Sequence, residues 1–175
     1  MKTWAPLYKD EDGASAIEFA LLAPVFIFFF LAAVTFFDVY RTYQNIVQAN
    51  GIIADVVSRQ TSMNSTSLDT MYGVFSNIQA TRQSGNALRI SLLKRKGSGF
   101  TVTWTKTRGD DDLFNDLETD ASGLPDVADG DSIVLVEGTA NYLGLTSLFG
   151  MGEIPLSGTA YSRPRFASTV AYQGS

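Results

Sequence analysis

The 175-residue chain contains no cysteine and no histidine. Without cysteine it can form neither a disulfide framework nor a thiolate metal site. Without histidine it lacks imidazole metal ligands, histidine-based triads and the commonest general base. No nucleophile elbow, phosphate-binding loop or serine–lysine motif stands out among the remaining residues. We therefore expect a protein that is not an enzyme and that needs no cofactor, metal or small-molecule substrate.

Positive charge is also scarce, with 13 Lys and Arg against 18 Asp and Glu and a net charge of −5. Such a composition offers no basic surface for nucleic acid. One short basic cluster, Lys94-Arg95-Lys96, precedes Gly97 and is interpreted as a solvated hairpin turn.

The acidic residues are concentrated between Gly109 and Asp131. Nine lie there: Asp110, Asp111, Asp112, Asp116, Glu118, Asp120, Asp126, Asp129 and Asp131. Calcium takes 6–8 oxygen ligands, so an irregular calcium site is one interpretation. The EF-hand pattern fails, because Pro125 and Val127 occupy two of the three acidic positions that it requires before Gly130. A solvated acidic loop is the preferred interpretation.

One long segment has no charge at all, namely the 19 residues from Phe19 to Phe37. At about 1.5 Å of rise per residue, a helix of this length nearly crosses a hydrocarbon layer of about 30 Å. A single segment can satisfy its own backbone in lipid only as a helix, so residues 14–37 are predicted to span a membrane. Pro24 should bend this helix, either as a harmless kink or as a hinge.

Glu18 lies at the start of the apolar segment, where a buried carboxylate is costly. It can reach water at the headgroup boundary, or it can have a cationic partner. If the chain were cut after Gly13, the new α-amine of Ala14 would lie one helical turn from Glu18 on the same face. That amine could neutralise Glu18 in the same subunit or in a neighbouring one.

Three stretches now carry a resemblance to a known family: GASAIEFALLAP from Gly13, DGDSIVLVEGTANY at 129–142 and SRPR at 162–165. The first resembles a type IV prepilin signal, and its wording is closest to the TadE-like family of the tight-adherence pilus. The resemblance implies that a prepilin peptidase removes residues 1–13 as a leader and that Glu18 helps to register subunits. It also implies a single-pass protein of the bacterial inner membrane with its C-terminal head outside the cytoplasm.

The helical pattern continues beyond the apolar segment. Apolar residues and one asparagine recur in steps of three and four at Phe36, Val39, Tyr43, Ile46, Asn50, Ile53 and Val57. One continuous helix is predicted from Ala14 to Gln60, with residues 38–60 packing on a globular head. A coiled coil is the alternative. A second helix is predicted from Leu68 to Arg82, with Thr66 and Asp69 as a variant capping box.

The period then changes to two, which is typical of strands with one buried face. Two strands, 88–92 and 100–105, form a predicted hairpin; two further strands are expected at 132–142 and 156–166. The connections favour an antiparallel meander of about four strands, with Pro155 and Pro164 at an edge or an end. The fold class is therefore α+β, with an exported head at 61–175 whose sheet is covered by the long helix.

Glu137 lies within an otherwise apolar strand. It either points to the wet face or forms a structural ion pair with Arg163 or Arg165 on a neighbouring strand, and the pairing is preferred.

These observations predict a structural protein, a minor pilin or pseudopilin of a tight-adherence pilus. Its partners would be the membrane, the prepilin peptidase and other pilins. One alternative is a signal-anchored exported enzyme or ligand-binding domain unrelated to pili, which would have no use for Glu18. A second is an assembly factor that keeps its leader and stays in the membrane.

Overall fold

The computed structural model describes residues 11–79, 83–117, 119, 123–144 and 152–174, and only the backbone of 11–14, 83 and 84. The chain divides into two compact units, Met1–Asp38 and Val39–Ser175. Residues 1–10 of the predicted leader lie outside the described residues.

Helix α1, Glu11–Ser58, is continuous through Pro24 and Gly51, as the sequence predicts. It begins at Glu11 instead of Ala14 and ends at Ser58 instead of Gln60. At its C-terminal end the amide of Arg59 donates to the carbonyl of Val56 (3.2 Å). Such an i→i+3 bond tightens the last turn and ends the helix.

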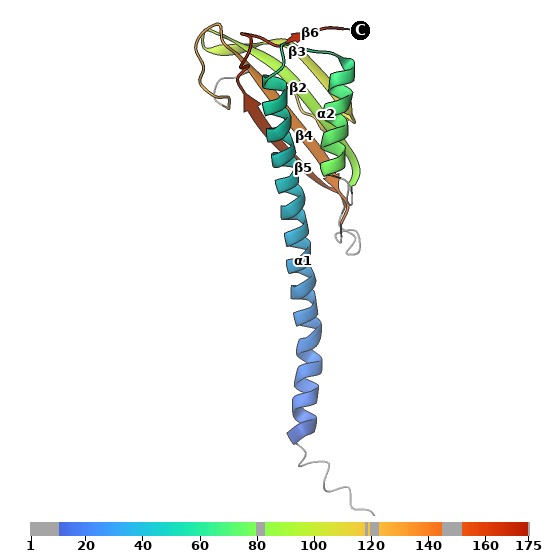
Figure 1. Cartoon of the computed structure of the whole chain (residues 1–175). Coiled ribbons are helices and arrows are strands. Elements are labelled where there is room, and N and C mark those ends of the chain that lie inside the picture. The colour runs from blue at the N-terminus through green and yellow to red at the C-terminus, as the bar shows by residue number, and fades with distance from the viewer. Residues whose placement is uncertain (1–10, 80–82, 118, 120–122, 145–151, 175) are drawn as a thin grey trace, which may run out of the picture. The chain divides into compact units, whose positions relative to one another are not determined.

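The second unit contains a four-stranded antiparallel sheet, which confirms the α+β fold class (Figure 1). Its strands are β2 (Gln83–Lys96), β3 (Gly99–Gly109), β4 (Ser132–Tyr142) and β5 (Ile154–Ser162).

The order of these strands is β3-β2-β4-β5, so the predicted meander is wrong. Strand β4 pairs with β2 instead of with β3, the strand before it in the chain. The acidic segment between β3 and β4 is long enough to carry the chain past β2. The bounds of β4 agree with the prediction, and Pro155 lies in the edge strand β5 while Pro164 follows it, as expected.

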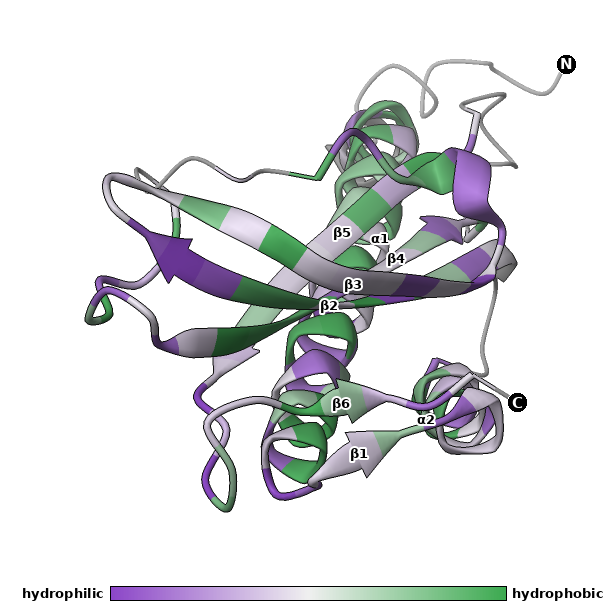
Figure 2. Cartoon of the chain, turned by 90° about the horizontal axis from the view of Figure 1, so that it is seen from above, coloured by the Kyte–Doolittle hydropathy of each residue, from purple (hydrophilic) through white to green (hydrophobic). Residues whose placement is uncertain are grey.

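The main core lies between this sheet and two helices, α1 and α2 (Ser65–Ile78). Figure 2 shows α2 and the C-terminal part of α1 on the same side of the sheet, together with the short parallel pair β1 (Ser62–Met63) and β6 (Ala171–Tyr172). The helical face predicted from the sequence is buried at Ile46, Asn50, Ile53 and Val57, whereas Tyr43 is exposed. The spacing therefore reflects packing on a sheet and gives no support for the coiled coil.

The start of α2 differs from the predicted capping box. The N-cap is Asn64, whose side-chain oxygen accepts a hydrogen bond from the amide of Ser67 (2.8 Å). Asp69 instead forms an ion pair with Arg108 of β3. Asn64 satisfies a helix N-terminus as well as serine or threonine would, so the pair Thr66 and Asp69 is not needed for capping.

Helix α1 lies close to the sheet at a cross-strand pair of glycines, Gly138 of β4 and Gly158 of β5. The side-chain amide of Asn50 donates to the carbonyl of Gly158 (2.7 Å). A methyl group at position 138 would overlap Asn50 Oδ1 and the ring of Phe75 from α2. The absence of a side chain at these two positions therefore makes room for Asn50 of α1 and Phe75 of α2 against the sheet.

The second unit has its own core, so we predict that a fragment lacking the first 37 residues is soluble and folded. Its circular dichroism should show mixed helix and strand and a single cooperative melting transition. A random-coil spectrum would contradict the prediction and would mean that the head needs the membrane helix or a partner to fold.

Candidate assembly helix and head ion pairs

The part of α1 that belongs to the first unit exposes a nearly continuous apolar surface. Phe19 and Phe36 are 71% and 79% exposed, and the other large apolar side chains between Ile17 and Phe37 are also open or only partly covered. The helix is long and apolar enough to cross a membrane. An apolar surface of this extent is unfavourable in water and favourable in lipid. The geometry therefore fits a membrane anchor.

Glu18 is the one charged residue between Ser15 and Phe37, and its side chain is exposed among apolar neighbours. None of the described side chains forms an ion pair with it. The backbone of Gly13 and Ala14 continues the same helix, so Ala14 precedes Glu18 by one turn and shares its face. A new α-amine on Ala14 would therefore be within reach of the carboxylate.

Two other residues of this apolar segment, Thr35 and Pro24, affect the hydrogen bonds of the helix backbone. The hydroxyl of Thr35 donates to the carbonyl of Leu31 (2.8 Å), so Thr35 requires no outside partner. Pro24 has no amide hydrogen, which leaves the carbonyl of Ala20 without its usual helical donor.

Glu137 forms an ion pair with Arg89 of β2, so the predicted pairing with Arg163 or Arg165 is wrong. The contact is bidentate: Arg89 Nε lies 2.6 Å from Glu137 Oε2, and Arg89 Nη2 lies 2.9 Å from Oε1. The register of β2 and β4 places these residues directly opposite each other, whereas Glu137 faces Thr159 on β5.

Arg89 is the residue that sequence reasoning missed. Its Nη1 also donates to the carbonyl of Asn115 (2.8 Å), and its guanidinium lies 4.6 Å from the centre of the Phe114 ring. The two charged side chains are only 11% and 16% exposed, so the pair is satisfied and largely shielded. The alternation of Leu88, Arg89 and Ile90 indicates that Arg89 faces away from the main core. It does not indicate which strand pairs with this one and places a residue opposite Arg89.

Arg163 and Arg165 have other partners at the end of the head. Arg163 lies 3.9 Å from Asp131, and Arg165 lies 2.9 Å from Asp55 of α1. The amide of Arg165 also donates to the carbonyl of Ser58 (2.8 Å), which satisfies one group at the C-terminus of α1. The segment after β5 therefore fastens the end of the helix.

The acidic segment does not gather its carboxylates in the part of the chain that the structure describes. No three of the described acidic residues lie together in a way that could hold a metal ion. Asp129 instead accepts a hydrogen bond from the amide of Gly97 (2.8 Å). Glu118 and Asp120 lie outside the described residues. Apolar residues Val127, Leu117 and Leu124 of this segment cover the outer face of the sheet at Leu93, Phe100, Ile133 and Leu135.

Comparison with known proteins bears on the first of these features. Residues 13–49 match the family model described as TadE-like protein. The match begins at Gly13, includes Glu18 and confirms over this segment the resemblance that the sequence shows. No curated protein and no solved structure matches the chain. The matched family and the candidate membrane span together support a membrane-anchored, pilus-associated protein.

Proposed function

We propose that this chain is a minor pilin or pseudopilin that enters, initiates or supports a tight-adherence pilus. The observation that carries the proposal is the segment from Gly13 to Phe37, which combines a prepilin-like cleavage motif, one acidic residue and an exposed apolar helix. The family match covers the same segment. The role is structural: α1 holds the subunit in the bilayer and contacts other pilins, and the head at 61–175 is carried outside the cytoplasm. The protein is acted on by a prepilin peptidase and is not itself an enzyme.

A signal-anchored enzyme or binding domain explains the apolar helix but not Glu18. An anchor gains nothing from a carboxylate in its first turns, because each such group opposes insertion. A pilin uses the carboxylate to bind the α-amine of a neighbour. Glu18 therefore favours the pilin over the simple anchor. The second alternative, a membrane assembly factor that keeps residues 1–13, differs from the pilin in its mature N-terminus.

We predict that the mature chain begins at Ala14 when the prepilin peptidase of the same cell is present. Gly13→Arg should block the cut, because glycine, which has no side chain, would be replaced by a bulky cation immediately before the cleavage site. Intact-mass spectrometry of the membrane-extracted protein measures the terminus. The control is a strain whose peptidase is inactive, in which both forms should keep Met1.

The same strains test the function. A mutant that lacks this chain should make few or no pili, and the unmodified chain should restore them while Gly13→Arg should not. A full-length protein in peptidase-competent membranes, together with normal piliation, would overturn the proposal. Cleavage without any effect on piliation would instead place the protein in another assembly that uses the same peptidase.

A further inference from the structure

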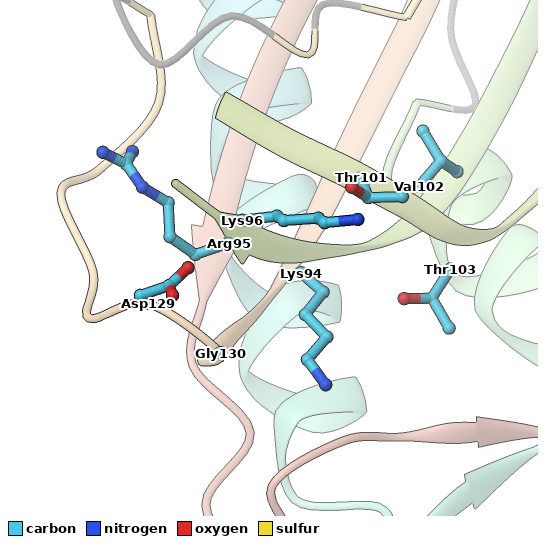
Figure 3. A pocket seen from close by; sticks show the side chains of 8 residues that line it. All are labelled: Lys94, Arg95, Lys96, Thr101, Val102, Thr103, Asp129 and Gly130. Atoms are coloured by element: carbon cyan, nitrogen blue, oxygen red, sulfur yellow. The ribbon is translucent and has the colours of Figure 1, made fainter. Parts of the chain in front are cut away.

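The tip of the β2–β3 hairpin borders a hollow of about 440 Å³ on the surface of the head (Figure 3). Its lining is formed by three segments of the chain: Lys94, Arg95 and Lys96 of β2; Thr101, Val102 and Thr103 of β3; and Asp129 and Gly130. A volume of several hundred Å³ suits a small ligand. The basic cluster Lys94-Arg95-Lys96, which is predicted to be a solvated turn, therefore borders an open hollow on the surface.

The side-chain ammonium groups of Lys94 and Lys96 have no hydrogen-bond or ion-pair partner among the described residues. In this they differ from most arginines of the head, which form ion pairs with its many acidic residues. Six arginines form ion pairs with carboxylates: Arg59, Arg89, Arg95, Arg108, Arg163 and Arg165. Lys106 lies over the ring of Tyr172, 4.9 Å from its centre. The two lysines at the hollow thus form no ion pair with a described carboxylate, and the carboxylate of Asp129 lines the same hollow.

The other charged groups at the hollow are already engaged. Asp129 accepts a hydrogen bond from the amide of Gly97 (2.8 Å). The side chain of Arg95 donates to the carbonyl of Gly97 (2.9 Å) and lies over the ring of Phe100. The backbone of Arg95 is bonded to the segment on the other side of the hollow. Its amide donates to the carbonyl of Asp131, and its carbonyl accepts from the amide of Gly130. These backbone hydrogen bonds join two of the three segments that line the hollow.

A β-bulge adds hydroxyl donors to these cations. Leu92 pairs with Trp104 and Leu93 pairs with Val102, so Thr103 is the extra residue in β3. Such a bulge redirects side chains locally. Figure 3 shows the hydroxyl of Thr103 pointing toward the space between the ends of Lys94 and Lys96. Neither Thr101 nor Thr103 has a side-chain hydrogen-bond partner in the described part of the chain.

We propose that this hollow binds a phosphate group, as a monoester or diester, through Lys94, Lys96 and Thr103. Two ammonium groups and a hydroxyl arranged around one space suit a tetrahedral oxyanion with several acceptor oxygens. Lysine binds phosphate as a point charge and does not require the planar, bidentate geometry of a carboxylate–arginine pair. The group can come from a soluble phosphate ester or from a lipid headgroup, and both present the same chemistry to the hollow.

The test uses the full chain at low ionic strength in micelles of dodecyl maltoside, a detergent without phosphate, with sn-glycerol 3-phosphate as the probe. Phosphorus NMR relaxation of the probe should report saturable binding. The double variant Lys94→Gln/Lys96→Gln should weaken it at least about tenfold, because each charge-assisted hydrogen bond is worth about a factor of ten. Lys106→Gln removes one positive charge from the same strand pair, and it should leave binding unchanged. Thr103→Val should weaken binding without a change of charge.

A second arm separates the two sources. In nanodiscs that contain phosphatidylglycerol, weaker binding of the probe would identify the headgroup as the competing ligand. Unchanged binding there would identify a soluble phosphate ester. Absence of saturable binding in the phosphate-free micelles would overturn the proposal, as would equal losses in the Lys94→Gln/Lys96→Gln and Lys106→Gln variants.

Discussion

Replacing Glu18 by alanine is expected to leave membrane insertion intact, or to improve it, and to abolish assembly into a pilus. An ionised carboxylate at the centre of a bilayer costs roughly 2.5–3.5 kcal/mol on insertion scales, and less near the end of a helix. Alanine removes this cost. It also removes the acidic partner that a neighbouring subunit's α-amine would require.

The physical reason lies in the position of Glu18 one turn after Ala14. In an isolated mature subunit, the two groups can neutralise each other across that turn. In an assembly, Glu18 can bind the amine of a neighbour instead, and such a contact fixes the axial offset between the two helices. An ion pair in a medium of low dielectric constant is strong once both of its groups have lost their water.

Two further variants sharpen this prediction. Glu18→Asp should give intermediate assembly, because the charge remains but the side chain is shorter. Thr35→Ala is the matched control, since the hydroxyl of Thr35 is already bound to the carbonyl of Leu31 in its own helix. Cleavage after Gly13 should persist in all of these forms if Glu18 acts after processing.

The measurements are membrane extraction for insertion, intact mass for cleavage, and pilus counts with cross-linking to other pilins for assembly. Normal assembly of Glu18→Ala would show that Glu18 is only an acid at the membrane interface. Such a result would favour the signal-anchored alternative over the pilin proposal. Failure of Thr35→Ala to assemble would show that the helix tolerates no substitution and that the Glu18 result is not specific.

The elements that the sequence predicts well are those set by local periodicity. Apolar residues in steps of three and four predict α1 and its buried face, and the largely apolar segment 132–142 predicts β4 with the bounds that the structure has. The prepilin-like motif at Gly13 is also local, and the family match begins there. None of these features depends on which distant segments come together.

The features that the sequence does not reveal depend on pairing between distant segments. The alternation of apolar residues does not tell whether β4 pairs with β2 or with β3, because both pairings would bury the same side chains. The position of β2 between β3 and β4 therefore cannot be deduced from it. The error in the strand order explains why Arg89 is not recognised as the partner of Glu137, since Arg89 faces it only when β2 and β4 pair. The hollow beside Lys94 likewise depends on a bulge and on the return of the chain at Gly130.

Replacing Gly138 by alanine is expected to destabilise the head. Among the described glycines of the sheet that have a negative φ, this replacement should have the largest effect. The added carbon would overlap Asn50 Oδ1 and the ring of Phe75, both of which belong to fully buried residues. Neither can move into open space, because the helices are packed against the sheet. Overpacking of this kind costs about 1–3 kcal/mol. For a unit of this size, the melting temperature should fall by roughly 5 °C or more.

Two glycine variants provide the matched controls for thermal unfolding of the full chain in detergent, followed by circular dichroism. At Gly158, the pairing partner of Gly138, a methyl group would lie 3.1 Å from Ile46 Cγ2, so Gly158→Ala should cost less. At Gly73 in α2 nothing lies within 4 Å, and alanine there should stabilise the helix by about 0.5–1 kcal/mol. The melting temperature is therefore expected to be highest for Gly73→Ala, lower for Gly158→Ala and lowest for Gly138→Ala. Equal melting temperatures for all three would mean that α1 and α2 do not pack on this glycine pair, because only that packing distinguishes the three sites.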